Sequence, residues 1–398
     1  MRGYLIVMAV AAVCTLLLTV LVWRFSLRYH LYPAIRERDV HTRPTPRLGG
    51  IAIFLGIAIA VAVSSRIHWF RLVFDHPGPF VALAVAALLI VSIGVIDDLW
   101  DLEWYTKLAG QALAAGILAW QGFQIVSLPI GGVLIGSGGG SLAVTVIFIV
   151  LIMNAVNFID GLDGLVTGVV LIASAVFFVY TYVLVTRTSP TDYFNLASLL
   201  TAAIVGACIG FLPMNWHPAR IFMGDSGALL FGMLMAVSAV SVTGQIDPSL
   251  MRDQSVWIPL LLPILVLTIP LVDFTMAVFR RVRAGKSPFS ADRKHLHHRL
   301  LDMGHNVFSA IAVFYSWTLV ISVSCFLPIV LPLGWVLLWF VVGCAACTLL
   351  TLWPRLQRRW TWLPQLPAEP RMMRHRQARS RLRSSTRNHC SGTARVLA

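Results

Sequence analysis

Long stretches of uninterrupted apolar residues recur from one end of the chain to the other, separated by short polar segments. Most are close to the roughly 20 residues that a helix needs to cross a bilayer. None shows the polar face of a helix on the surface of a soluble protein. The pattern predicts an all-α polytopic membrane protein with eleven transmembrane helices. We place these spans at 3–23, 49–65, 78–96, 107–121, 141–158, 164–186, 195–212, 226–244, 256–279, 308–330 and 332–353.

The composition agrees with this prediction. Hydrophobic residues make up 58% of the 398 positions and charged residues only 12%, whereas about 25% of the residues of a soluble domain are charged. A soluble protein built on one large core is therefore excluded. The first stretch has little basic charge before it and no clear small-residue cleavage site, so we expect it to remain as a span.

The Lys and Arg residues predict how the spans are oriented. If the loops after odd-numbered spans are cytoplasmic, that side holds 26 of the 31 Lys and Arg residues, and the other side holds five. Because positive residues concentrate on the cytoplasmic side of membrane proteins, we expect the N-terminus outside and the C-terminus in the cytoplasm. Residues 1–353 then form the transmembrane domain of a plasma (inner) membrane protein.

Residues 354–398 are predicted to form a basic, disordered cytoplasmic tail that faces anionic lipid. Its strongly basic stretch from 371 onward has no interleaved aromatic residues, and the chain has no nucleic-acid-binding pattern. We therefore expect no nucleic-acid partner.

The acidic residues also follow the predicted topology. The loops on the outer side hold only four scattered aspartates. Solvated loops would carry acids without regard to side, so clustering at one face indicates a single site built from several loops. Nine acids beside the spans all fall on the cytoplasmic side: Asp97, Asp98, Asp101, Glu103, Asp160, Asp163, Asp225, Asp292 and Asp302.

The stretch IDDLWD, at the end of the third span, holds Asp97, Asp98 and Asp101. Close carboxylates repel one another unless a cation or a proton joins them. An ordinary exit of a helix into water would also place acids here. The same D-D-x-x-D spelling binds magnesium in prenyl-diphosphate enzymes, which in addition need a second such motif and a soluble helical fold.

Amides and carboxylates gather again in NAVNFIDGLDGL, residues 154–165. Asn154 and Asn157 lie at the end of the fifth span. Asp160 and Asp163 come next, and each is followed directly by a glycine. Amide and carboxylate oxygens suit a hard cation such as magnesium, and ionisable residues at membrane depth are functional candidates. In FMGDSG, residues 222–227, Asp225 either caps the eighth span or holds a metal that binds phosphate.

The longest polar loop, residues 280–304, offers guanidinium, ammonium and imidazole donors together. Its histidine spacing does not suit zinc, and we interpret it as a surface that binds polyanions. Metal-binding oxygens beside a basic loop at the membrane surface favour chemistry on a nucleotide diphosphate and a lipid phosphate, since phosphoryl transfer needs mainly alignment and charge neutralisation.

The chain resembles the polyprenyl-phosphate N-acetylhexosamine-1-phosphate transferase family from about residue 39 to residue 306, in its WecA-type branch. Five motifs in the same order carry the resemblance. They are RPTPRLGG at 43–50, DDLWD at 97–101, NAVNFIDGLDGL at 154–165, FMGDSG at 222–227 and SPFSADRKHLHH at 287–298.

The resemblance implies that a polyprenyl phosphate attacks the β-phosphorus of UDP-N-acetylglucosamine, so that UMP leaves and a lipid-linked diphosphate sugar forms. It implies Asp225 and Asn157 as ligands of magnesium, for which manganese is a substitute. Asp97 and Asp98 correspond to the pair that receives the lipid phosphate, and Asp160 is a further candidate catalytic residue. Whether any carboxylate acts as a base stays open, because a phosphate monoester is already largely ionised near pH 7.

The resemblance also implies substrate contacts on the cytoplasmic face of the membrane. Asp163 is expected to hydrogen-bond the uracil, and Phe222 to stack on it. The diphosphate and sugar are expected to contact Arg293, His295, His297 and His298.

Two alternatives stay open at this point. The muramoyl-pentapeptide branch of the family usually carries a His-His-His-x-Glu loop, from which this chain departs at Leu296 and after His298. A multi-span transporter would place its acids near the membrane midplane and often shows internal repeats, which we do not find. The sequence does not fix the oligomeric state and is compatible with a homodimer.

Overall fold

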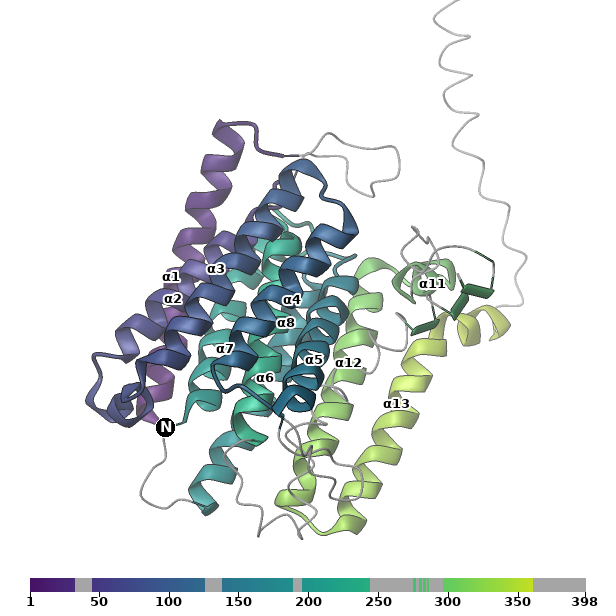
Figure 1. The fold of residues 1–398 in the computed structure, drawn as a ribbon. Helices are drawn as coiled ribbons and strands as arrows, with labels where there is room; N and C mark the ends of the chain where they lie inside the picture. The colour runs from purple at the N-terminus through teal and green to yellow at the C-terminus, as the bar shows by residue number, and fades with distance from the viewer. Residues whose placement is uncertain are drawn as a thin grey trace, which may run out of the picture. The chain divides into compact units, whose positions relative to one another are not determined.

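A computed structural model describes residues 1–32, 45–125, 138–188, 195–243 and 296–360, together with a few positions between 275 and 285. Throughout these residues the regular structure is helical, and strands are absent from them. Short connections join several successive helices where the connecting residues are described (Figure 1). The chain divides into two units, Met1–Leu352 and Trp353–Ala398, and nearly all of the described helices belong to the first.

The helices follow the apolar stretches of the sequence. The α-helices are α1 Arg2–Arg28, α2 Gly49–Ser64, α3 Pro77–Trp100, α4 Trp104–Trp120, α5 Gly138–Phe158, α6 Leu165–Thr188, α7 Leu196–Asn215, α8 Gly224–Thr243, α11 Leu296–Asp302, α12 Val307–Phe326 and α13 Leu333–Trp360. Two 3₁₀ helices, η1 His68–Phe74 and η4 Leu327–Ile329, lie between them. Ten of the eleven predicted spans coincide with a helix, while the span predicted at 256–279 falls almost wholly outside the described residues.

Eight of these helices are long and apolar enough to cross a membrane. The pair α2 and η1, which is bent by 106°, would add a ninth span. Helix α4 has only 17 residues and falls short of this length. The protein is thus an all-α polytopic membrane protein, whereas the count of eleven spans and the orientation of the termini stay predictions.

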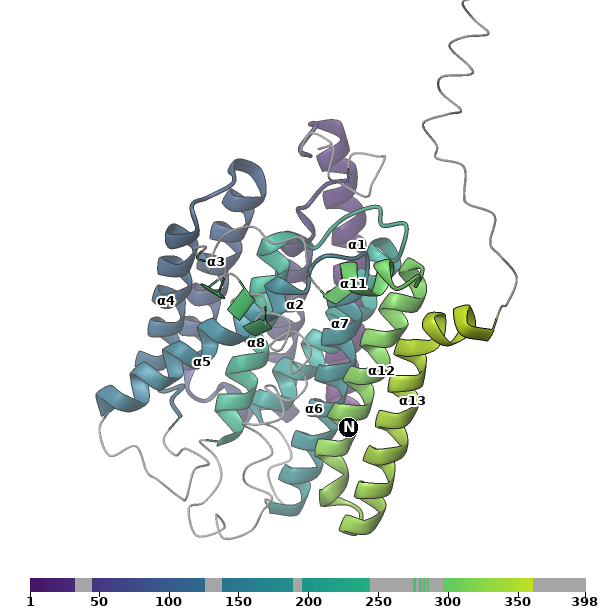
Figure 2. The ribbon, with the colours of Figure 1, turned by 90° about the vertical axis from the view of Figure 1, so that its right-hand side faces the viewer.

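Helices α7 and α8 form the core of the first unit. Almost every residue of α8 is buried, and α8 contacts α2, α3, α5 and α7 (Figure 2). Small residues allow this close packing, because helices in lipid associate through backbone approach and not through hydrophobic burial. On α7, for example, Gly206 and Gly210 lie against the backbone of Met8 and Ala12 in α1, where a Cβ atom would clash. The close packing of these helices sets the positions of the ends of α3 and α8.

Candidate active site

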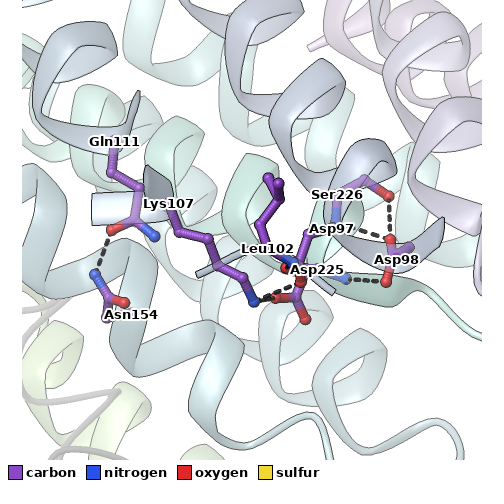
Figure 3. A network of polar contacts seen from close by, with 8 residues as sticks. All are labelled: Asp97, Asp98, Leu102, Lys107, Gln111, Asn154, Asp225 and Ser226. Carbon is purple, nitrogen blue, oxygen red and sulfur yellow. Dashed lines mark hydrogen bonds and ion pairs between the residues drawn. The ribbon is translucent and has the colours of Figure 1, made fainter. Parts of the chain in front are cut away.

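The C-terminal end of α3 meets the N-terminal end of α8 through the side chain of Asp98 (Figure 3). The backbone N–H of Asp225 donates to Oδ1 of Asp98 at 3.1 Å, and the N–H of Ser226 donates to Oδ2 at 3.4 Å. The Ser226 hydroxyl donates to the same Oδ2 at 3.2 Å. The first N–H groups of a helix lack partners within the helix, so Asp98 caps α8 from a neighbouring helix. The sequence allowed Asp225 to be the cap of this helix. In the structure, Asp98 caps it instead.

Two glycines permit this approach. At Gly94 in α3, a Cβ atom would clash with the backbone of Ser226. Gly224, which begins α8, has a φ of +70°, and a Cβ atom there would clash with Asp98 and with the carbonyl oxygen of Arg47. Glycine at both positions follows from the contact between α3 and α8.

Two of the sequence motifs pair through their backbones. The N–H of Phe222 donates to the carbonyl of Pro46 at 2.8 Å, and the N–H of Gly49 donates to the carbonyl of Phe222 at 3.0 Å. The N–H of Gly50 donates to the carbonyl of Met223 at 2.9 Å. The described part of RPTPRLGG and the start of FMGDSG, which are far apart in sequence, therefore form one structural unit that leads into α8.

A lysine joins the carboxylates of two helices. The Lys107 ammonium in α4 forms an ion pair with Asp225 at 2.8 Å and a second ion pair with Asp97 (Figure 3). The other carboxylate oxygen of Asp97 accepts from the N–H of Leu102 at 2.8 Å, which holds the turn between α3 and α4. Asp101, in that turn, adopts a left-handed conformation (φ 58°), and its side chain is exposed. Asp97 and Asp225 thus share one cation.

The two asparagines that end α5 have different surroundings. The Asn157 side chain makes hydrogen-bonding contact with the carboxylate of Asp225. Asn154 instead donates to the side-chain oxygen of Gln111 in α4, and to the carbonyl of Val150 at 2.8 Å (Figure 3). Asn157 therefore belongs to the acidic site, whereas Asn154 holds α4 against α5.

Asp160 follows α5 at the edge of this site. Enclosure by the surrounding protein and repulsion from Asp225 raise its pKa to about 7, with a smaller rise from Asp163 and an opposing effect from Arg47. Its side chain is nevertheless exposed, so solvent screens part of this shift. Asp160 and Arg47 thus lie within electrostatic range of the acidic cluster.

Asp163 lies deeper than the sequence suggested. It is 3% exposed, and its Oδ2 faces Nδ1 of His217 at 2.8 Å and the N–H of Ala219 at 3.0 Å. Both partners belong to the loop between α7 and α8. Phe222, at the end of the same loop, is partly exposed. Of the two predicted uracil contacts, Phe222 therefore lies on the loop between α7 and α8, and Asp163 lies in the turn after α5 that this loop contacts.

The basic loop is described only in part. Arg293 and His295 lie outside the described residues. His297 and His298 lie in α11, of which the backbone is described at these positions and the side chains are not. Their contacts with the diphosphate and sugar stay predictions.

Comparison with known proteins identifies the family. Residues 80–243 match the model of glycosyl transferase family 4. Decaprenyl-phosphate N-acetylglucosaminephosphotransferase of Mycolicibacterium smegmatis is 36% identical to the chain over 365 residues, which cover 90% of each protein. The chain belongs to glycosyl transferase family 4. The matched region of this family member contains Asp97, Asp98, Asn157 and Asp225.

Two further relatives carry names with different donors. Undecaprenyl-phosphate alpha-N-acetylglucosaminyl 1-phosphate transferase of Thermotoga maritima is 29% identical, over 72% of this chain and 78% of the relative. Phospho-N-acetylmuramoyl-pentapeptide-transferase of Mycolicibacterium vanbaalenii is 34% identical, over 62% and 78%. Both named donor sugars therefore occur among relatives of this family member.

Three polar residues in or beside the candidate site were not singled out from the sequence. Lys107 entered only as one positive charge of a cytoplasmic loop, although it is the only Lys or Arg between Arg71 and Arg187. Gln111 is a polar residue within an apolar helix, which is a signal for a partner in a neighbouring helix. His217 stands five residues before the first residue of the FMGDSG motif, and nothing in the sequence connects it to Asp163.

Proposed function

We propose that this family member transfers N-acetylglucosamine 1-phosphate from UDP-N-acetylglucosamine to a membrane polyprenyl phosphate, which releases UMP. This would be the first step in the synthesis of a cell-envelope polysaccharide. The observation that carries the proposal is the bridge of Lys107 between Asp97 and Asp225. This bridge places charges of both signs where α3, α4 and α8 meet. A relative in the same family is named for the transfer of N-acetylglucosamine phosphate to decaprenyl phosphate.

The reaction joins two anions. An oxygen of the lipid phosphate attacks the β-phosphorus of the nucleotide sugar, and the bond from that phosphorus to the bridging oxygen breaks. The bridging oxygen and its electron pair leave with UMP. Positive charge is needed to bring the phosphates together, because catalysis of phosphoryl transfer consists mainly of alignment and charge neutralisation. Lys107 and Arg47 supply such charge from the protein.

Magnesium fits the oxygen donors of this site. Among the described residues, groups of three or more His, Cys, Asp and Glu side chains that could hold a metal ion are absent. Magnesium sites that also bind substrate phosphates usually take only one or two carboxylates from the protein. Asp225 and the adjacent Asn157 would provide such a set. The ion, for which manganese could substitute, would neutralise the diphosphate charge that develops as UMP leaves.

The remaining acids take different parts in the proposal. Asp98 makes three hydrogen bonds to the start of α8 and fixes Asp225 in place. Asp97, held by Lys107 and Leu102, would receive the lipid phosphate together with Asp98, and Asp160 would be a further catalytic residue beside them. A base is not required there, because the phosphate is already largely ionised near pH 7.

The nucleotide would lie along the loop between α7 and α8. Asp163 and Phe222 take the uridine, and the diphosphate extends from there toward Asp225 and Lys107. The sugar then lies under the basic loop. That loop contributes Arg293, His295, His297 and His298.

Two observations favour N-acetylglucosamine over the muramoyl-pentapeptide donor. The transferase of Mycolicibacterium smegmatis matches 90% of the chain, whereas the muramoyl-pentapeptide transferase of Mycolicibacterium vanbaalenii matches 62%. The basic loop also departs from the His-His-His-x-Glu pattern at Leu296. The relatives' names point to an acceptor with a decaprenyl or undecaprenyl chain.

The protein would act in the plasma membrane with its site on the cytoplasmic face, where UDP-sugars are available. The excess of Lys and Arg in the loops that carry the motifs supports this placement. It would work either alone or as a homodimer.

The experiment that tests the proposal uses the purified protein with labelled UDP-N-acetylglucosamine, polyprenyl phosphate and magnesium. We expect UMP and a lipid-linked labelled sugar in equal amounts, and neither product without the lipid phosphate. Vesicles that take up the nucleotide sugar without forming UMP would instead indicate a transporter.

A further inference from the structure

A histidine outside the predicted site holds the buried carboxylate of Asp163. Because Oδ2 of Asp163 acts as an acceptor toward the N–H of Ala219, we assign the Nδ1–H of His217 as the donor in their 2.8 Å contact. The Asp163 side chain is 1% exposed and that of His217 is 28% exposed. A buried carboxylate is costly without hydrogen-bond donors, so this contact contributes to holding Asp163 in place.

The contact fixes a loop as well as a side chain. Asp163 also accepts from the N–H of Ala219 at 3.0 Å. Two residues therefore tie the loop between α7 and α8 to the turn that follows α5. The far part of the loop has its own anchor: Asn215 accepts from the Thr167 hydroxyl at 2.7 Å and donates to the carbonyl of Ile221 at 3.1 Å. Phe222 and Asp225 follow directly after this second anchor.

The imidazole of His217 touches a third element. Its ring meets the ring of Phe308, at the start of α12, edge to face with centroids 5.3 Å apart. Helix α12 also reaches the turn after α5, where the Tyr315 hydroxyl donates to the carbonyl of Gly164 at 2.6 Å. His217 thus has two separable contacts, a hydrogen bond to Asp163 and a ring contact to Phe308.

We propose that His217 is a positioning residue for the nucleotide donor. Its Nδ1 hydrogen bond orients Asp163 and the loop that carries Phe222, so that the uridine part of the substrate meets a preformed surface. This inference rests on the proposed function, because Asp163 and Phe222 are assigned there to the uridine. Binding to a preformed surface avoids the cost of ordering the loop, so the effect falls on donor affinity.

Two substitutions separate the two contacts of His217. His217→Phe keeps an aromatic ring against Phe308 and removes the donor to Asp163. His217→Asn places an amide N–H close to where Nδ1 stands and removes the ring. If the hydrogen bond positions the donor site, His217→Phe raises the KM for UDP-N-acetylglucosamine about tenfold, the effect expected when a hydrogen bond to a charged group is lost. His217→Asn recovers most of that affinity.

The KM for polyprenyl phosphate and the kcat report whether the effect is confined to the donor. We expect both to stay within about threefold of the unmodified enzyme in His217→Phe. UMP binding measured by calorimetry on the detergent-purified protein should weaken by the same factor as the donor KM. Thermal unfolding of each variant identifies any loss that comes from misfolding.

An unchanged donor KM and unchanged UMP binding in well-folded His217→Phe would overturn the inference. So would a loss in His217→Asn equal to that in His217→Phe, because the ring contact would then be the cause. UMP release by the unmodified enzyme is measured in the same series. Its absence would contradict the proposed function, whereas its presence with unaffected variants would contradict only the role of His217.

Discussion

The carboxylate of Asp225 lies between the Lys107 ammonium and the Asn157 amide, in the first turn of α8. At the scale of single residues, this is the position from which the proposed metal would reach the donor phosphates. Asp98 already caps α8, so substitution of Asp225 alters the charge of the site without removing the cap.

Asp225→Asn is therefore expected to lower kcat by at least about a hundredfold, comparable to the loss of one electrostatic stabiliser of a transition state. The fold should survive, because the amide has the shape of the carboxylate. UMP release at several magnesium concentrations measures the effect. Near-normal turnover with an unchanged magnesium dependence would show that Asp225 does not hold the metal.

The two asparagines of α5 give a matched comparison. Asn154→Ala removes a hydrogen bond between α4 and α5, which is worth about 0.6 kcal/mol on average in a membrane, so we expect a slightly lower Tm and turnover within about threefold. Asn157→Ala removes the contact with Asp225, and we expect turnover to fall at least about tenfold. Equal losses of turnover in the two variants would contradict this division.

Single residues were predictable from the sequence where a motif carried them, and hidden where a contact joined distant segments. Asp97, Asp98, Asn157 and Asp225 stand in polar clusters beside apolar spans, which is a local signal. Lys107 reaches Asp225 across 118 positions of sequence. No local pattern indicates such a pair, since only the packing of α4 against its neighbours creates it.

At the scale of elements, the crossing of α3 and α8 determines where the acids stand. The crossing is close because Gly94 has no side chain, and a Cβ atom there would clash with the backbone of Ser226. A separation of these helices would move Asp98 away from the N-terminus of α8, and Asp225 away from Lys107.

Gly94→Ala should therefore reduce both turnover and thermal stability, with a destabilisation of about 1–3 kcal/mol as is common for overpacking. Gly116→Ala in α4 is the control, because a Cβ atom there has nothing within 4 Å and alanine favours a helix more than glycine does. Turnover and Tm measured on both proteins test this. A Gly94→Ala protein as active and as stable as the control would mean that the two helices do not approach so closely.

Helix positions were predictable because the length of an apolar stretch decides whether it can cross a membrane. The spans predicted at 78–96 and 226–244 lie within or nearly within α3 and α8, although α3 continues to Trp100. That extension carries Asp97 and Asp98 on a helix and not in a loop. The pairing of RPTPRLGG with FMGDSG could not be predicted, because backbone contacts between loops leave no periodic pattern.

At the scale of the whole molecule, the charge distribution predicts one orientation in the membrane. Cysteines introduced at Ser287 and Ser137 of the active protein should react with an impermeant thiol reagent from opposite sides. We expect position 137 to be labelled in intact cells, and position 287 only after the membrane is opened, because positive loops stay in the cytoplasm. Labelling of position 287 in intact cells would show that the orientation is opposite to the predicted one. The site would then have no access to cytosolic nucleotides.

The proposed function requires that the enzyme use a simple N-acetylhexosamine nucleotide and a polyprenyl phosphate acceptor. A site whose polar groups match the N-acetyl and hydroxyl groups of one sugar penalises donors that leave those groups unpaired. The most direct test gives the purified protein UDP-N-acetylglucosamine or the UDP-muramoyl-pentapeptide, separately, with the same lipid phosphate, and measures UMP release. We expect a kcat/KM at least about a hundredfold higher for UDP-N-acetylglucosamine. Faster UMP release from the muramoyl-pentapeptide donor would contradict it.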